Sequence, residues 1–253
     1  MDEEKLRQQL IEAIGSDKQI GEHIARLDSG FGTYEDVNDI AMFIGGRIAD
    51  ELIASYSPEV LEAYLREGHS LITLFAEVAQ KNLNDAAGIG LKPMLTKPPD
   101  ARIKALAEEL SAVAPEMLPD ELANAIPPEM LSMVDAIVKY NADFQAKAGL
   151  QPVIVRTWSG SYPSHDTKHT DWCHDLAGEW EYGDEPREVY ARHEGCQCTV
   201  EYFPNKLAKG RIAALSKYEV DRDGALWNTR ADTLDKRLKD AARRRELDRK
   251  YGK

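Results

Sequence analysis

The sequence has no long apolar run, few cysteines and no excess of positive charge. No uninterrupted apolar stretch approaches the roughly 18 residues that a membrane-spanning helix needs, so no membrane span is predicted. The 253 residues carry 32 Lys and Arg against 44 Asp and Glu, and the net charge of −12 excludes a generally basic nucleic-acid-binding protein. An odd number of cysteines, three, makes a poor disulfide framework, so we expect the chain to act in a reducing compartment.

Tryptophan and cysteine are both missing from residues 1–149, and this divides the composition in two. That first part is rich in Ala, Leu, Ile and Glu, whereas all four Trp and all three Cys lie beyond it. Helix-forming residues therefore dominate the first part, and β-rich runs appear only afterwards. We predict an α+β fold with a mainly helical domain over 1–149, a small mixed α/β module containing the Cys and His residues over 150–205, and a basic, largely helical C-terminal arm over 206–253.

Local signals predict where some of the elements begin. Ser57 followed by Pro58 is typical of a helix start, with serine as the N-cap and proline at the first helical position. Pro127 and the proline after it predict the start of a longer helix in the same way. Short β-rich runs predict strands over 152–156 and 198–203.

The residues with metal-binding chemistry gather between positions 165 and 198. This segment contains all three cysteines together with several histidines, and thiolate and imidazole are the preferred ligands of zinc in closed structural sites. The predicted zinc ligands are Cys173, His193, Cys196 and Cys198, with His169 in reserve. The alternative interpretation is that these are ordinary buried cysteines and surface histidines.

Three stretches of the second part have a characteristic order and spacing. They are GLQPVIVRT at 149–157, WCHDLAG at 172–178 and VYARHEGCQCTVEY at 189–202. Together they resemble the C-terminal signature of the Mu F-like head morphogenesis family, the minor head proteins of tailed bacteriophages. In that signature a Cys-x-x-Cys precedes Leu-x-Gly, and an Arg-His-x-x-Cys-x-Cys follows about 20 residues later. The resemblance covers about a fifth of the chain.

The resemblance implies a structural protein of the virion head that engages the portal or the major capsid protein. It implies a role in head morphogenesis or in genome packaging and ejection, with the protein in the host cytoplasm during assembly, and it does not by itself imply catalysis. One position departs from the family, since Thr170 stands where the first cysteine of Cys-x-x-Cys is common. Threonine is not a normal zinc ligand, so either His169 takes this place or packing replaces the metal.

The C-terminal end of the chain is locally basic despite the negative total. Residues 229–253 hold ten Lys and Arg against five acids, a local charge of +5. Such an arm is expected to contact packaged DNA or the acidic surface of a partner, or else to be a solvated helix whose acids pair with its bases. The candidate contact residues are Lys236, Arg237, Lys239, Arg243, Arg244, Arg245, Arg249 and Lys250.

An enzyme is the alternative class. Histidines beside acids could hold a metal and activate water, as in HNH-type nucleases, and His165-Asp166 and His193-Glu194 are the candidates for such roles. No spacing between them demands this chemistry, so we expect no enzyme activity. A zinc-stabilised nucleic-acid-binding module belongs to the same alternative.

Overall fold

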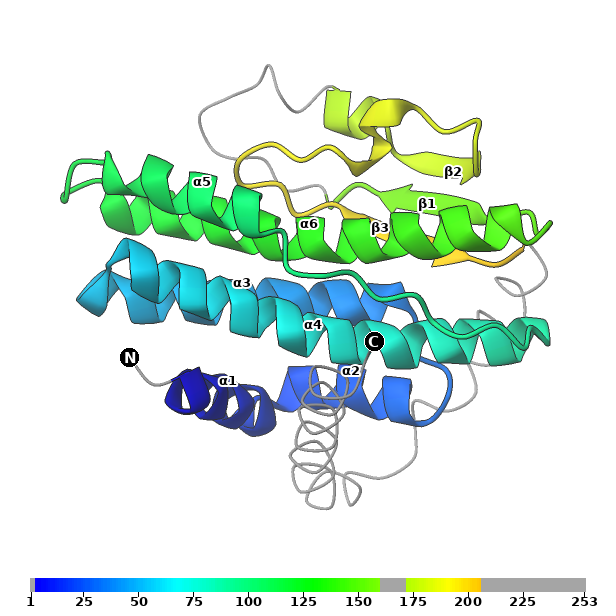
Figure 1. Ribbon diagram of the computed structural model, residues 1–253, viewed down its shortest axis with the longest axis horizontal. Helices are drawn as coiled ribbons and strands as arrows, with labels where there is room; N and C mark the ends of the chain where they lie inside the picture. The colour runs from blue at the N-terminus through cyan, green and yellow to red at the C-terminus, as the bar shows by residue number, and fades with distance from the viewer. Residues whose placement is uncertain (1–2, 160–171, 206–253) are drawn as a thin grey trace, which may run out of the picture.

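The computed structural model describes residues 3–159 and 172–205 (Figure 1). In these ranges a helical bundle is followed by a small sheet, which confirms the predicted α+β class. The helices are α1 (Glu3–Ser16), α2 (Lys18–Asp28), α3 (Tyr34–Ser55), α4 (Pro58–Ala87), α5 (Asp100–Ser111) and α6 (Leu118–Lys147). The strands are β1 (Val153–Thr157), β2 (Gly178–Glu181) and β3 (Thr199–Phe203), with the 3-10 helix η1 (Arg187–Tyr190) between the last two. None of the described helices is long and apolar enough to cross a bilayer.

The start of α4 follows from its sequence. Ser57 is the N-cap, and its side chain accepts a hydrogen bond from the backbone N–H of Val60 at 3.2 Å. Pro58 occupies the first turn, where its missing N–H costs nothing. The helix ends at Ala87, and the C-cap that follows, Gly88, has a φ of 70°, a left-handed conformation that glycine adopts without strain. The helix start predicted at Ser57-Pro58 is confirmed.

The start predicted for α6 is wrong. The helix begins at Leu118, and Pro127 and Pro128 lie inside it. A proline in a helix leaves the carbonyl four residues earlier without its usual N–H partner. Here the carbonyl of Asn124, four residues before Pro128, accepts the N–H of Gly195 at 3.0 Å. A segment distant in sequence therefore replaces the hydrogen bond that the proline removes.

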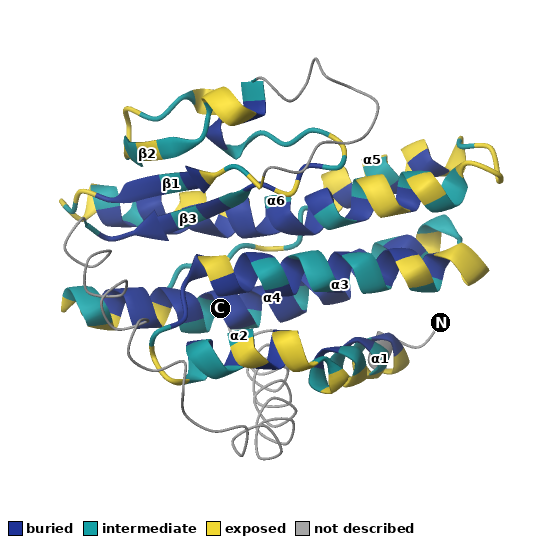
Figure 2. Ribbon diagram, turned by 180° about the vertical axis from the view of Figure 1, so that it is seen from behind, coloured by how far each residue is buried: buried dark blue, intermediate teal, exposed yellow. Residues whose placement is uncertain are grey.

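Helix α3 is the centre of the bundle and packs along both α4 and α6 (Figures 1 and 2). Its contact with α6 is very close at Gly45. A methyl group at this position would lie 2.6 Å from the Cα of Pro127, which is far inside van der Waals contact. Glycine is therefore required for α3 and α6 to cross at this distance.

The three strands form an antiparallel sheet in the order β2-β1-β3. Its apolar residues join the core of the bundle, so one hydrophobic core extends from the helices into the sheet (Figure 2). On β3, the ring of Tyr202 meets that of Tyr34 of α3 edge-on at 6.4 Å, and the carbonyl of Val200 accepts a hydrogen bond from Asn38 Nδ2 at 3.1 Å. These contacts hold β3 against the bundle.

A carboxyl group on β3 lies at the start of α3. Thr33 Oγ1 donates a hydrogen bond of 3.0 Å to Glu201 Oε1, and Thr33 is also the N-cap of α3. Burial raises the pKa of Glu201 to about 7, and the negative charge of the nearby Glu35 and Asp36 adds to this effect. Folding therefore favours the protonated carboxyl group at this position.

Glu201 is expected to make the protein less stable as the pH rises. Its raised pKa contributes stability that is complete below pH 4.5 and is lost as the pH approaches 7, a total of up to about 3 kcal/mol. Glu201→Gln should remove this contribution to the decrease in the free energy of unfolding between pH 5 and pH 7.5, as measured by urea unfolding. Glu22→Gln, at an exposed position of α2, is the control and should keep it. Equal slopes for wild type and Glu201→Gln would contradict the prediction.

Candidate metal centre

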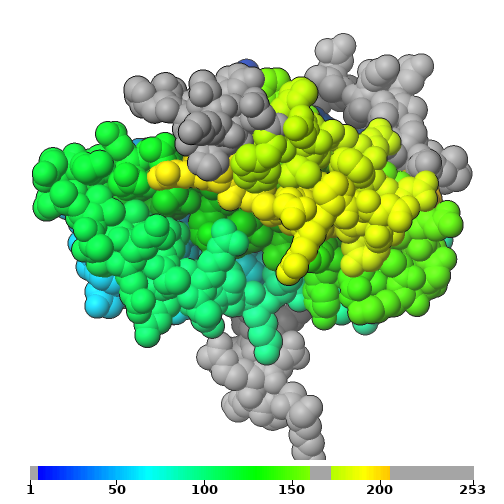
Figure 3. Space-filling model, turned by 90° about the horizontal axis from the view of Figure 1, so that it is seen from above, coloured from blue at the N-terminus to red at the C-terminus, as the bar shows by residue number. Residues whose placement is uncertain are grey.

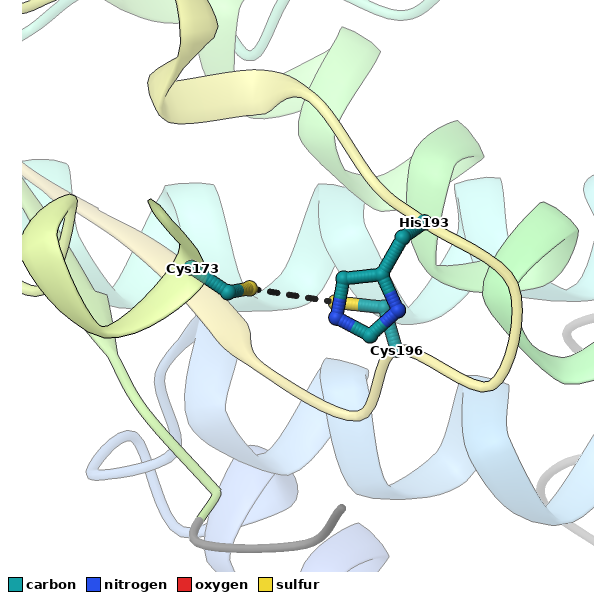
Figure 4. A group of neighbouring side chains, drawn as sticks. All are labelled: Cys173, His193 and Cys196. Carbon is teal, nitrogen blue, oxygen red and sulfur yellow. Dashed lines mark hydrogen bonds between the residues drawn. The ribbon is translucent and has the colours of Figure 1, made fainter. Parts of the chain in front are cut away.

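Three cysteines from two separate segments meet beside the sheet. Figure 4 shows two of them, Cys173 and Cys196, together with His193. Cys173 lies in a short helix over 172–175, whereas Cys196 and Cys198 lie in the loop before β3. All three are at most 2% exposed. The sulfur of Cys173 is 3.8 Å from that of Cys196 and 3.2 Å from that of Cys198. The buried cysteines therefore form one group of sulfur atoms.

His193 completes a group that could hold a metal ion. One ligand atom each from Cys173, His193 and Cys196 lies within 4.8 Å of the others. In a tetrahedral site with metal–sulfur bonds of about 2.3 Å, two sulfur atoms are about 3.8 Å apart. The separation of 3.8 Å between Cys173 and Cys196 matches this value. Cys173, His193 and Cys196 thus fit a small thiolate-bound ion, whereas the 3.2 Å between the sulfur atoms of Cys173 and Cys198 is shorter than this value.

A tight turn brings the ligands of the second segment together. The N–H of Cys196 donates to the carbonyl of His193 at 3.1 Å, which closes a β-turn. Gly195 has a φ of 68°, the left-handed conformation that the third position of such turns often requires. The N–H of Gly195 binds the carbonyl of Asn124 in α6, so the turn is attached to the bundle.

Aromatic rings cover the group of sulfur atoms. Trp158 and Trp172 pack against the three cysteines. The Trp172 ring also meets the His193 ring edge-on at 5.7 Å. These apolar surfaces keep water from the sulfur atoms and limit the positions that the imidazole of His193 can take.

Two arginines bring positive charge to the sulfur atoms. Arg156 of β1 is 1% exposed, and its Nη2 lies 3.0 Å from Cys173 Sγ. Arg192 Nη1 lies 3.9 Å from Cys196 Sγ. Hydrogen bonds from Cys173 and Cys198 hold the pKa of the Cys196 thiol well below its usual value, and the charge of Arg192 acts in the same direction. The pKa of Cys173 is raised because it donates to the neighbouring sulfur atoms. The group therefore favours a thiolate at Cys196, the form that binds metal.

Comparison of the chain with protein-family models, with curated proteins and with solved structures gives no significant match. The resemblance to the Mu F-like head proteins thus rests on the spacing of residues 149–204 alone, and it stays a prediction.

The structure brings together most of the predicted ligands. Cys173, His193 and Cys196 form the candidate group, and Cys198 is in contact with Cys173. His169 and Thr170 lie outside the described residues, as do His165 and the eight basic residues predicted for the arm. The roles that the sequence predicts for these residues stay predictions.

Three charged residues at the centre were not predicted as site residues. Arg156, Arg192 and Asp135 are all buried, and each has a charged or sulfur-bearing partner. A sequence signal existed for Arg156, which ends the apolar run of the strand predicted over 152–156. Asp135 similarly interrupts the apolar residues of a helix. Neither signal identifies the partner.

Proposed function

We propose that the chain is a structural minor head protein of a tailed bacteriophage and acts by binding the portal or major capsid protein. The observation that carries the proposal is the group formed by the buried Cys173 and Cys196 with the partly buried His193, beside which the buried Cys198 contacts Cys173. These are residues of the motif that resembles the Mu F-like family, and they come from segments about 20 positions apart. Their convergence supports a shared structural role for the motif.

We propose zinc as the ion. Three thiolates and one imidazole form a ligand set that suits zinc and disfavours magnesium or calcium, which prefer oxygen ligands. With Cys198 as the fourth ligand the site is closed, as structural zinc sites are, whereas catalytic sites keep a position for water. The ion would join the short helix at 172–175 to the loop before β3.

The zinc centre would serve binding by fixing the shape of a small module. Three short strands bury little apolar surface by themselves, and a metal ion adds stability where a core is small. Figure 3 shows the module, in yellow, on the outside of the bundle and against the green helices. A rigid module there and the exposed helices of the bundle would offer surfaces to the portal or capsid. The basic residues of 229–253 would contact packaged DNA.

The nuclease alternative has less support in the geometry. His193 Nδ1 lies 2.6 Å from the carbonyl oxygen of Glu194, its own neighbour, so this ring nitrogen is engaged by backbone. The cysteines that surround the site are buried, and they supply sulfur where hydrolytic magnesium sites use oxygen. The centre is therefore better suited to stability than to hydrolysis.

The purified full chain tests the two functions together. We expect it to leave supercoiled plasmid intact with added Mg²⁺, Mn²⁺ or Zn²⁺, and to be retained by tagged portal protein co-expressed from the same genome. The major capsid protein is the second bait, and an unrelated portal is the control. Retention by neither protein would contradict the minor head function. Plasmid nicking that His193→Ala abolishes would establish the nuclease instead.

A further inference from the structure

A buried ion pair connects the candidate metal centre to helix α6. Arg192 lies between η1 and the metal-binding turn, and its Nε and Nη2 bind the two carboxylate oxygens of Asp135 at 2.5 Å and 2.7 Å. The side chains are 2% and 3% exposed. Burying both charges costs desolvation energy, which only close partners offset. The two hydrogen bonds from Arg192 to the carboxylate of Asp135 are close enough to offset part of this cost.

The other side of Arg192 faces the cysteines. Its Nη1 donates to the carbonyl of Cys198 at 2.5 Å and lies 3.9 Å from Cys196 Sγ. One guanidinium therefore contacts both α6 and the loop that carries two candidate ligands. The hydrogen bond between Gly195 and Asn124 attaches the same loop to α6 at a second point.

Arg156 holds the sulfur atoms from the sheet. Its Nη1 donates to the carbonyls of Val189 and Ala191 at 2.5 Å and 3.0 Å, and its Nη2 reaches Cys173 Sγ. The guanidinium is thus fixed by backbone on one side and by sulfur on the other. Two positively charged guanidinium groups, those of Arg156 and Arg192, therefore lie beside the sulfur atoms. Arg192 is also paired with the negative carboxylate of Asp135.

We propose that metal binding clamps the sheet module onto α6 through Arg192 and Asp135, with Arg192 and Arg156 as positioning residues. The inference rests on the proposed zinc centre. Three thiolates bound to one Zn²⁺ carry a net charge of about −1, so the loaded site attracts both guanidinium groups. Because Asp135 already holds the Arg192 side chain in place, its guanidinium group faces that negative charge without rearrangement. Because coupling is reciprocal, the ion should strengthen the contact with α6 as much as Asp135 strengthens binding of the ion.

Asp135→Asn tests the clamp without touching a ligand. Outer-shell substitutions commonly weaken metal binding about 10- to 100-fold, and we expect a loss in this range for zinc, measured on the full chain by competition with a chromophoric chelator. The matched control is Glu129→Gln. Glu129 is also a buried acid of α6, 4% exposed and paired with Arg102 at 2.7 Å, but its partner does not contact the cysteines. Glu129→Gln should bind zinc like wild type.

The outcomes separate the clamp from the zinc centre. A wild-type chain that binds no zinc would overturn the centre, and the clamp with it. Zinc binding by wild type with no loss in Asp135→Asn, or with an equal loss in both variants, would overturn only the clamp. If Asp135→Asn does not fold, hydrogen exchange of wild type decides. Removal of zinc should accelerate exchange over 124–138 of α6 and leave α1 unchanged, whereas unchanged exchange in α6 would contradict the clamp.

Discussion

Cys196→Ser is expected to abolish stoichiometric zinc binding and to lower the free energy of unfolding by about 3 kcal/mol or more. Cys196 is buried beside Cys173, and serine oxygen is a poor replacement for a thiolate at zinc. The free energy of metal binding contributes directly to folding, so its loss destabilises the module. The substitution also removes a sulfur atom that faces Arg192, which leaves a buried charge less compensated.

The matched control for this substitution is His174→Ala. His174 follows Cys173 directly, but its side chain is 63% exposed and lies outside the candidate group. Elemental analysis should give about one zinc per chain for this control and much less for Cys196→Ser, and urea unfolding should give the loss of stability for Cys196→Ser alone. Full zinc content in Cys196→Ser, or an equal loss in both variants, would contradict the assignment.

Gly45→Ala is expected to lower the free energy of unfolding by about 2–3 kcal/mol. The added methyl group would lie 2.6 Å from the Cα of Pro127 and 3.1 Å from its nitrogen. Both atoms belong to the backbone of α6, so the contact can be relieved only by moving the two helices apart. Overpacking of this kind typically costs 1–3 kcal/mol, and here it disturbs the central crossing of the bundle.

The neighbouring glycine provides the control. A methyl group at Gly46 meets no atom within 4 Å. Gly46→Ala should therefore raise the free energy of unfolding by about 0.5–1 kcal/mol, because alanine favours the helix more than glycine does. Urea unfolding of both variants measures the contrast. Similar effects at the two positions would show that the close crossing of α3 and α6 does not limit stability.

Features encoded over a few residues could be predicted from the sequence. The start of α4 depends on Ser57 and Pro58, which are adjacent, and β1 and β3 follow from local β-rich runs, whereas β2 was not predicted. The candidate ligands could also be predicted, because thiolate and imidazole have a narrow range of roles when they occur together. The ligands lie in only two short segments, so a single contact between these segments is enough to form the group.

Features that depend on distant partners could not be predicted. Pro127 and Pro128 indicate a helix start, and only the contact between Asn124 and Gly195 shows how α6 continues through them. Arg192 and Asp135 are 57 positions apart, and each by itself is typical of an exposed side chain. Charged residues become site residues here because folding buries them together, and the sequence pattern carries no record of that pairing.

X-ray absorption at the zinc edge of the purified full chain tests the central claim most directly. The account predicts one zinc per chain, bound by three sulfur atoms at about 2.3 Å and one nitrogen at about 2.0–2.1 Å. A chain without stoichiometric metal, or a first shell composed mainly of oxygen and nitrogen, would contradict the zinc centre at Cys173, His193, Cys196 and Cys198.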